Sequence, residues 1–304
     1  MTHVLRTPEG RFANLPDYPF TPNYCTVGDG LRLHYVDEGP RDGPVMLMMH
    51  GEPSWSYLYR HMIPVAAAAG FRVLAPDLIG FGKSDKPAHR SDYGFSTQVG
   101  WIRQWMEALD LRDITLVCQD WGSLIGLRLA AENETRFAGI VLSNGGLPTG
   151  EEKMSTVWRI WEKFARWSPW FPIDKILQFG SKKTFTSAEL AAYNAPFPDE
   201  RYKEAARIYP ALVPVRYDDP EAALCRSAWE VYKRWEKPFL TCFSDGDPVL
   251  RGGDKVFRKR VPGAQTQPHT TLHGGHFIQE DDPLRFVQLA IEQARSNPLL
   301  KRPA

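Results

Sequence analysis

Short apolar runs and amphipathic stretches alternate along the chain. Residues 45–49 are apolar throughout, which is typical of a strand buried on both faces of a parallel sheet. Other strand-type runs are residues 31–36, 72–76, 139–143 and the run that begins at Thr115. Segments with helical spacing lie between them, at residues 56–69, 96–109 and 124–131. The alternation predicts an α/β protein with a mostly parallel sheet and helices on both faces.

The pattern changes between residues 148 and 234. This segment has no strong strand pattern, and its helix-type stretches are rich in aromatic residues and broken by prolines. Strand-type sequence resumes after it, at residues 238–243, 244–249 and 270–272, and a final helix is expected at residues 283–296. We therefore expect a core built from residues 1–147 and 235–304. Residues 148–234 are expected to form a helical cap over the active edge of the sheet.

Composition excludes some classes of function but does not identify the function. The 304 residues are 43% hydrophobic and 24% charged, with a net charge of +1, which gives no electrostatic basis for binding nucleic acid or an anionic membrane. No apolar run is long enough to span a bilayer, and the first residues lack the apolar region of a signal peptide. The four cysteines are scattered and nothing demands an oxidising compartment. We expect a cytoplasmic monomer.

A carboxylate stands at the turn between a buried strand and a helix. Asp120 follows the apolar run that begins at Thr115 and precedes the helical segment Leu124–Ala131. In hydrolases, strand-turn-helix elbows of this kind usually carry a serine nucleophile, exposed above the edge of the sheet. The alternative is that Asp120 caps the helix, since Asp is a favoured N-cap residue.

An acid and a histidine follow the elbow in a meaningful order. Asp247 and Asp245 both come directly after the strand at residues 238–243, and Asp245 is the better candidate for a turn cap. His276 lies on a glycine-rich loop after a strand, whereas His269 and His273 lack that setting. The order nucleophile, acid, histidine is the one in which α/β-hydrolases present their catalytic triad.

Four motifs, in this order along the chain, closely resemble those of the haloalkane dehalogenases of the α/β-hydrolase superfamily, over roughly residues 25 to 290. They are His50-Gly-Glu-Pro-Ser-Trp55, Asp77-Leu-Ile-Gly-Phe-Gly-Lys-Ser-Asp-Lys-Pro87, Gln119-Asp-Trp-Gly122 and Gly274-Gly-His-Phe-Ile-Gln-Glu280. The resemblance implies an α/β-hydrolase fold with an inserted cap. It also implies a substrate that is a small halogenated alkane, consumed with water to give a primary alcohol and a halide ion.

The resemblance also implies a role for each site residue. Asp120 would displace the halide and become an alkyl ester, and His276, oriented by Asp247, would activate the water that hydrolyses it. The backbone N–H groups of Glu52 and Trp121 would hold the oxyanion of the second step. No metal or organic cofactor is expected.

The leaving halide needs hydrogen-bond donors that are not themselves bases, and the indole N–H is a donor only. Trp121 directly follows the nucleophile and is the first candidate. By its position in the cap, Trp161 matches the second halide-binding tryptophan of the family. Trp158, one helical turn earlier, is the alternative.

Other functions remain open at this point. Epoxide hydrolases use the same aspartate chemistry with cap tyrosines, and the cap contains Tyr193, Tyr202, Tyr209 and Tyr217. Glu52 disfavours that function, because epoxide hydrolases typically carry an aromatic residue there. An esterase is disfavoured, because Ser123 does not stand at the elbow position where an esterase carries its nucleophile. A fluoroacetate dehalogenase is disfavoured as well, because the arginines that would bind the substrate carboxylate are not evident after Asp120. A non-catalytic sensor on this scaffold would be expected to lack one triad residue, and none is missing.

Overall fold

A computed structural model describes residues 3–300 of the chain. Its main sheet has seven strands in the order β2-β3-β5-β4-β7-β8-β9. The strands are β2 (Asn23–Val27), β3 (Leu31–Glu38), β4 (Val45–Met49), β5 (Arg72–Pro76), β7 (Ile114–Cys118), β8 (Phe137–Leu142) and β9 (Phe239–Thr241). The pairings β2–β3 and β3–β5 are antiparallel, and the remaining pairings are parallel. A separate antiparallel pair joins β1 (Val4–Leu5) to β6 (Lys86–Pro87).

The two central strands place the site at one edge of the sheet. Every residue of β4 and of β7 is buried, as expected for strands covered on both faces. In their parallel register Met49 lies opposite Cys118, so both strands end at the same level. The segments that follow, His50–Glu52 and Gln119–Trp121, therefore leave the sheet side by side. Ligand sites of open α/β sheets lie beyond this carboxyl edge.

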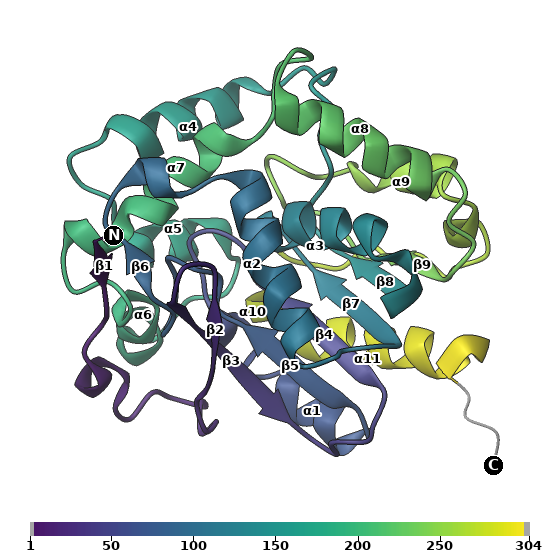
Figure 1. Cartoon of the computed structure of the whole chain (residues 1–304), viewed down its shortest axis with the longest axis horizontal. Coiled ribbons are helices and arrows are strands. Elements are labelled where there is room, and N and C mark those ends of the chain that lie inside the picture. Colours follow the sequence, from purple (N-terminus) through teal and green to yellow (C-terminus); the bar gives the residue numbers. More distant parts are fainter. Residues whose placement is uncertain (1–2, 301–304) are drawn as a thin grey trace.

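Helices cover the sheet in two groups (Figure 1). One group contains α2 (Phe95–Ala108) and α3 (Trp121–Glu132), which contact each other, and α3 also contacts α8 (Pro220–Tyr232). The other contains α1 (Ile63–Ala68), which contacts α11 (Pro283–Ser296). The predicted α/β architecture is thereby confirmed.

The chain between β8 and β9 is helical. Its helices are α4 (Thr156–Trp167), α5 (Ile173–Gly180), α6 (Ser187–Asn194), α7 (Glu204–Leu212) and α8. Figure 1 shows α4 and α8 along the top of the molecule and α5 and α6 at its left. We refer to residues 148–234 as the inserted segment.

Three local expectations from the sequence are wrong. The helix expected at residues 56–69 is split into a 3₁₀ turn, Ser56–Tyr59, and α1. Pro64 explains the break, because it lacks an N–H donor and favours the first turn of a helix. The expected strands 244–249 and 270–272 form only an isolated bridge between Ser244 and Leu272. Strand β2 lies outside the predicted strand-type runs, and its mixed burial as an edge strand explains the weak pattern.

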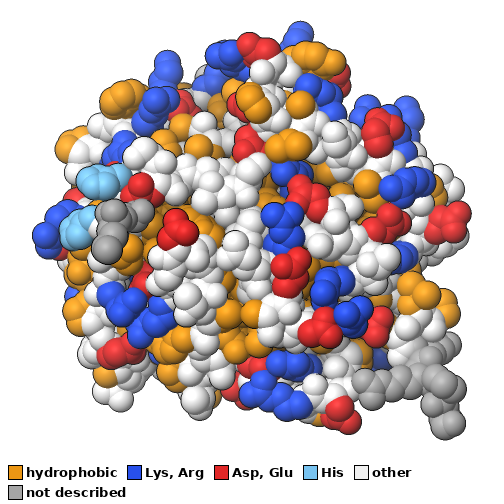
Figure 2. All heavy atoms as spheres, viewed as in Figure 1, with side chains coloured by type: hydrophobic (Ala, Val, Ile, Leu, Met, Phe, Trp, Pro, Cys, Tyr) orange, Lys and Arg blue, Asp and Glu red, His pale blue; other side chains and the backbone are white. Residues whose placement is uncertain are grey.

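Charged side chains of both signs are interspersed on the face shown in Figure 2. None of the helices within residues 3–300 has the length and apolar character required to cross a lipid bilayer.

Candidate active site

Asp120 lies on a strained turn between β7 and α3. Its backbone angles are φ 50° and ψ −131°, a conformation that residues other than glycine rarely adopt. Although Asp120 occupies the N-cap position of α3, its side chain makes no capping hydrogen bond, so the helix-cap interpretation is wrong. A Cβ atom on Gly122 would lie 2.1 Å from the Met49 carbonyl oxygen, so glycine is needed for α3 to start this close to β4. The turn directs the carboxylate away from the helix.

The loop after β4 supplies a hydrogen-bond donor to this carboxylate. The backbone N–H of Glu52 donates to Oδ1 of Asp120 at 2.7 Å. A Cβ atom on Gly51 would lie 2.2 Å from the same oxygen, so the absence of a side chain permits the approach. Trp121 is the first residue of α3, and an amide at that position has no acceptor within the helix. The structure therefore brings the two predicted oxyanion donors to the elbow, and Glu52 already contacts Asp120.

The Glu52 side chain is buried beside this charge. It is only 5% exposed, and its Oε1 atom has no hydrogen-bond partner in the described chain. Burial, with the negative charge of Asp120, raises the pKa of Glu52 well above its ordinary value. The raised pKa favours protonation of Glu52, which lessens its repulsion of the Asp120 carboxylate.

His276 is held by Asp247. Nδ1 of His276 lies 2.8 Å from Oδ2 of Asp247, while Oδ1 of Asp247 accepts from the amides of Val249 at 2.8 Å and Leu250 at 3.0 Å. Burial alone would raise the pKa of Asp247, but the positive charge of His276 and these hydrogen bonds outweigh burial and lower it. Asp247 is therefore an anion that fixes the ring and its Nδ1–H.

The other candidates have different partners. Asp245 contacts His273 and Lys182 at the surface and accepts from the Gly274 amide, 29 residues away in the sequence. It does not cap its own turn as expected; Asp247 accepts from the amides two and three residues further on instead. His269 contacts Thr241 and the Ala264 carbonyl. Among the candidate pairs, Asp247 with His276 is the one that faces Asp120.

The imidazole of His276 lies between two carboxylates. Its Nε2 atom is 3.6 Å from Oδ2 of Asp120, on the side of the ring opposite Asp247. The side chains of Asp120 and His276 retain 21% and 18% exposure, so neither is fully closed off from solvent. Burial would lower the pKa of His276, but Asp247 and Asp120 together outweigh it and raise the pKa to about 10. The ring is therefore protonated while both carboxylates are charged.

Two polar residues beside Asp120 and His276 were not predicted from the sequence to belong to the site. Gln119 Nε2 lies 2.9 Å from Nε2 of His276 and 3.2 Å from its carbonyl oxygen. Asn144 Nδ2 donates to the carbonyls of Gly275 and His276, and the Asn144 carbonyl accepts from the Asp120 amide at 2.9 Å. Gln119 follows β7 and Asn144 follows β8, so both lie at the carboxyl edge of the sheet. That position in the sequence could have identified them as site residues.

His50, the first residue of the His50–Trp55 motif, has a structural role. Its Nε2 accepts from the Leu78 amide at 3.0 Å and its Nδ1 lies 2.9 Å from the Gly51 carbonyl oxygen. Burial lowers the pKa of His50, which favours the neutral ring. His50 thus fixes the loop that carries the Glu52 amide.

The two predicted halide-binding tryptophans lie in separate aromatic clusters. Trp121 is 3% exposed and packs against Phe95 and Tyr209, with ring centroids 5.4 and 4.6 Å away. Its indole N–H has no acceptor within residues 3–300. Trp161, on α4, packs against Phe164 and Phe171, and the described structure shows no ring contact between Trp121 and Trp161.

The four candidate tyrosines of the inserted segment differ in their surroundings. Tyr193 donates its hydroxyl hydrogen bond to Glu280, and Tyr217 is 60% exposed. The hydroxyls of the buried Tyr209 and the half-buried Tyr202 have no partner in the described chain. The hydroxyls alone therefore do not exclude epoxide chemistry, and Glu52 is the residue that disfavours it.

Comparison with known proteins agrees with this geometry. A sequence family described as the α/β-hydrolase fold matches residues 44–283. The haloalkane dehalogenase of Psychrobacter cryohalolentis is 51% identical, over 97% of this chain and 99% of that protein. The one from Mycobacterium marinum is 50% identical, over 91% and 95%. The tetrameric structure of haloalkane dehalogenase DpaA from Paraglaciecola agarilytica NO2 superposes with a TM-score of 0.86 at 36% identity, over 97% and 98%. The chain therefore belongs to the haloalkane dehalogenase family of α/β-hydrolase fold.

Proposed function

We propose that this protein is a haloalkane dehalogenase, which hydrolyses the carbon–halogen bond of a small haloalkane to an alcohol and a halide ion. The observation that carries the proposal is the replacement of the elbow serine by Asp120, whose carboxylate faces His276 and accepts the Glu52 amide. A carboxylate can displace halide from an sp³ carbon, and the ester it forms has an acyl carbon that water can attack.

The first step divides the roles of the two Asp120 oxygens. Oδ1 is held by the Glu52 amide, whereas Oδ2 faces His276 and the accessible space. Oδ2 attacks the carbon that bears the halogen, the new C–O bond forms as the carbon–halogen bond breaks, and the halide leaves with the bonding electron pair. Oδ1 becomes the carbonyl oxygen of the ester.

The second step uses His276 as a base. When Asp120 becomes an ester its negative charge is lost, so one of the two carboxylates that raise the pKa of His276 disappears. The ring can then release its proton and accept one from a water molecule, whose oxygen attacks Cγ of Asp120. The oxyanion on Oδ1 is stabilised by the amides of Glu52 and Trp121. The ester C–O bond then breaks, His276 protonates the alkoxide, and the alcohol leaves.

The halide released in the first step is assigned to Trp121 and Trp161. Trp121 supports this role through its unpaired indole N–H, next to the nucleophile in a buried aromatic cluster. Trp161 lies on α4 of the inserted segment, and its position there matches the second halide-binding tryptophan of the family.

We also propose that residues 148–234 act as a cap domain on a core formed by residues 1–147 and 235–304. The uninterrupted run of helices from α4 to α8 supports this division. We expect a cytoplasmic monomer. The free state of all four cysteines supports a reducing compartment, and size-exclusion chromatography with light scattering distinguishes a monomer from a tetramer.

Halide release tests the proposal. Purified protein incubated with 1,2-dibromoethane should release bromide without added metal or cofactor, and Asp120→Asn should release none. Ser123→Ala, three residues further on in the first turn of α3, is the matched control and should still release bromide. Turnover of styrene oxide with no bromide release from any bromoalkane would instead assign epoxide hydrolysis.

A further inference from the structure

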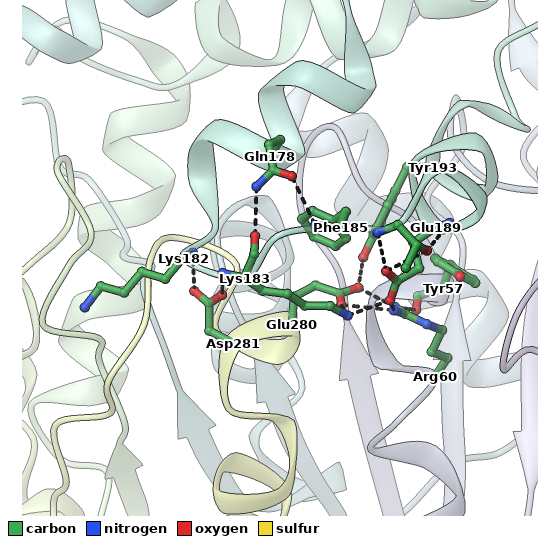
Figure 3. Close-up of polar contacts among 11 residues, drawn as sticks. Tyr57, Arg60, Gln178, Lys182, Lys183, Phe185, Glu189, Tyr193, Glu280 and Asp281 are labelled. Carbon is green, nitrogen blue, oxygen red and sulfur yellow. Dashed lines mark hydrogen bonds and ion pairs between the residues drawn. The ribbon is translucent and has the colours of Figure 1, made fainter.

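The short helix α10 (Ile278–Asp281) begins two residues after His276 and carries two consecutive acids, Glu280 and Asp281. Their carboxylates bind different partners, and many of these partners lie in the inserted segment (Figure 3). Neither acid takes part in the reaction steps derived above. Their contacts connect the inserted segment to residues 274–277, the loop that carries His276, which we call the base loop.

Asp281 binds backbone amides from both sides of this junction. Its Oδ2 atom accepts from the N–H of Gly275 at 2.6 Å and of Lys182 at 3.0 Å, and its Oδ1 atom accepts from the N–H of Lys183 at 2.8 Å. Gly275 directly precedes His276. One carboxylate therefore joins the base loop to residues 182–183, with charge-assisted hydrogen bonds.

The backbone of His276 touches the same part of the inserted segment. Its N–H donates to the Gly180 carbonyl at 2.6 Å. A Cβ atom on Gly275 would lie 2.3 Å from that carbonyl oxygen, so the two chains are in close contact. The position of the imidazole therefore depends on how residues 180–183 are held.

Glu280 anchors α10 from the other side. Its side chain is fully buried and binds the Arg60 guanidinium, Lys183 Nζ at 3.0 Å and the Tyr193 hydroxyl. Glu189 joins the same cations. A buried charge is tolerated when it is paired and hydrogen-bonded in this way. Although the ligand atoms of His61, Glu189 and Glu280 lie within 4.8 Å of one another, Arg60 and Lys183 already neutralise the two carboxylates, so we assign no metal to them.

We propose that Asp281 is a positioning residue for His276, and that it acts on hydrolysis of the ester rather than on cleavage of the carbon–halogen bond. Asp120 is held by groups outside α10, the Glu52 amide and the Asn144 backbone carbonyl, although the Asn144 side chain also donates to the carbonyls of Gly275 and His276. Loss of the Asp281 carboxylate would therefore release the base loop while Asp120 stays in place. This inference rests on the proposed two-step function.

The two steps give this positioning role a kinetic signature. When a covalent intermediate forms and then breaks down, kcat/KM reports only the events up to its formation. Slower hydrolysis therefore lowers kcat and KM by the same factor and leaves kcat/KM unchanged. A general loss of structure would instead lower kcat/KM.

The experiment is a single-turnover reaction of 1,2-dibromoethane with excess enzyme, quenched rapidly and followed by intact mass. In Asp281→Ala the decay of the alkyl-enzyme should slow by about tenfold or more, as expected for a misplaced catalytic group, while its formation stays unchanged. Asp282→Ala is the matched control, because Asp282 caps α11 through the Arg285 amide and should leave both rates unchanged. In the steady state, kcat and KM of Asp281→Ala should fall together.

An unchanged decay rate in Asp281→Ala would overturn the inference, and so would a matching loss in the rate of ester formation. If Asp281→Ala does not fold, Asp281→Asn carries the test, since it keeps one acceptor oxygen and should slow decay to a smaller extent. Wild-type decay in Asp281→Asn would then count against the role. If the wild-type enzyme itself forms no ester, the proposed function fails, which is a separate result.

Discussion

Nε2 of His276 lies 3.6 Å from Oδ2 of Asp120, too far for a good hydrogen bond, and the two groups attract mainly through charge. On its other side the ring makes a 2.8 Å hydrogen bond to Asp247. This difference suits a reaction in which the Asp120 carboxylate is converted to an ester while Asp247 keeps its charge. The bond to Asp247 orients the ring throughout, whereas the attraction to Asp120 ends when Asp120 becomes an ester.

Removal of the Asp120 charge should lower the pKa of His276. Both carboxylates raise this pKa, to about 10, and Asp120→Asn leaves only Asp247 to do so. The pKa should therefore move down toward the ordinary histidine value of about 6.5. Two-dimensional NMR of the histidine ring nitrogens measures it, with His269, whose charged neighbours do not include Asp120, as an internal reference. An unchanged His276 titration would contradict the proposed activation of the base.

Gly51→Ala should impair catalysis without unfolding the protein. The added Cβ would lie 2.2 Å from Oδ1 of Asp120 and displace the carboxylate from the Glu52 amide. We expect kcat/KM for bromide release to fall by about a hundredfold, as for a reacting group misplaced by about 1 Å. Gly146→Ala is the control, because a Cβ there meets no atom within 4 Å. Near wild-type activity in Gly51→Ala would mean that this contact is not needed.

Halide binding should depend on Trp121 and Trp161. Each indole offers an N–H donor that is not itself a base, so replacement by phenylalanine removes a donor but keeps an aromatic ring. Bromide binding, followed through quenching of tryptophan fluorescence, should weaken in Trp121→Phe and in Trp161→Phe. Trp158→Phe is the matched control on the same helix. Weaker binding in Trp158→Phe alone would reassign the second donor.

The sheet and the triad could be anticipated because their signals are local. A run such as Val45–Met49 must be buried on both faces, and chemistry in this fold lies where such strands end. Asp120, Asp247 and His276 each follow a strand-type run within a short distinctive motif. Their joint order along the chain favoured the catalytic interpretation of Asp120, and the missing capping hydrogen bond in the structure then excluded the helix cap.

The remaining parts depend on contacts between distant segments. Asp281 reaches Lys182, 99 residues away in the sequence, and no pattern around either residue indicates that contact. Gln119 and Asn144 become notable only once the His276 loop lies over them. Trp158 and Trp161 differ by one helical turn, so their roles depend on how α4 packs rather than on their spacing.

The most direct test of the central claim uses His276→Phe. Without the base the first half-reaction should still proceed, whereas hydrolysis of the ester should stop. After incubation with 1,2-dibromoethane, intact mass should show one bromoethyl adduct per chain, and peptide mapping should place it on Asp120. Unmodified His276→Phe enzyme after exposure to several bromoalkanes, or an adduct on another residue, would contradict the account.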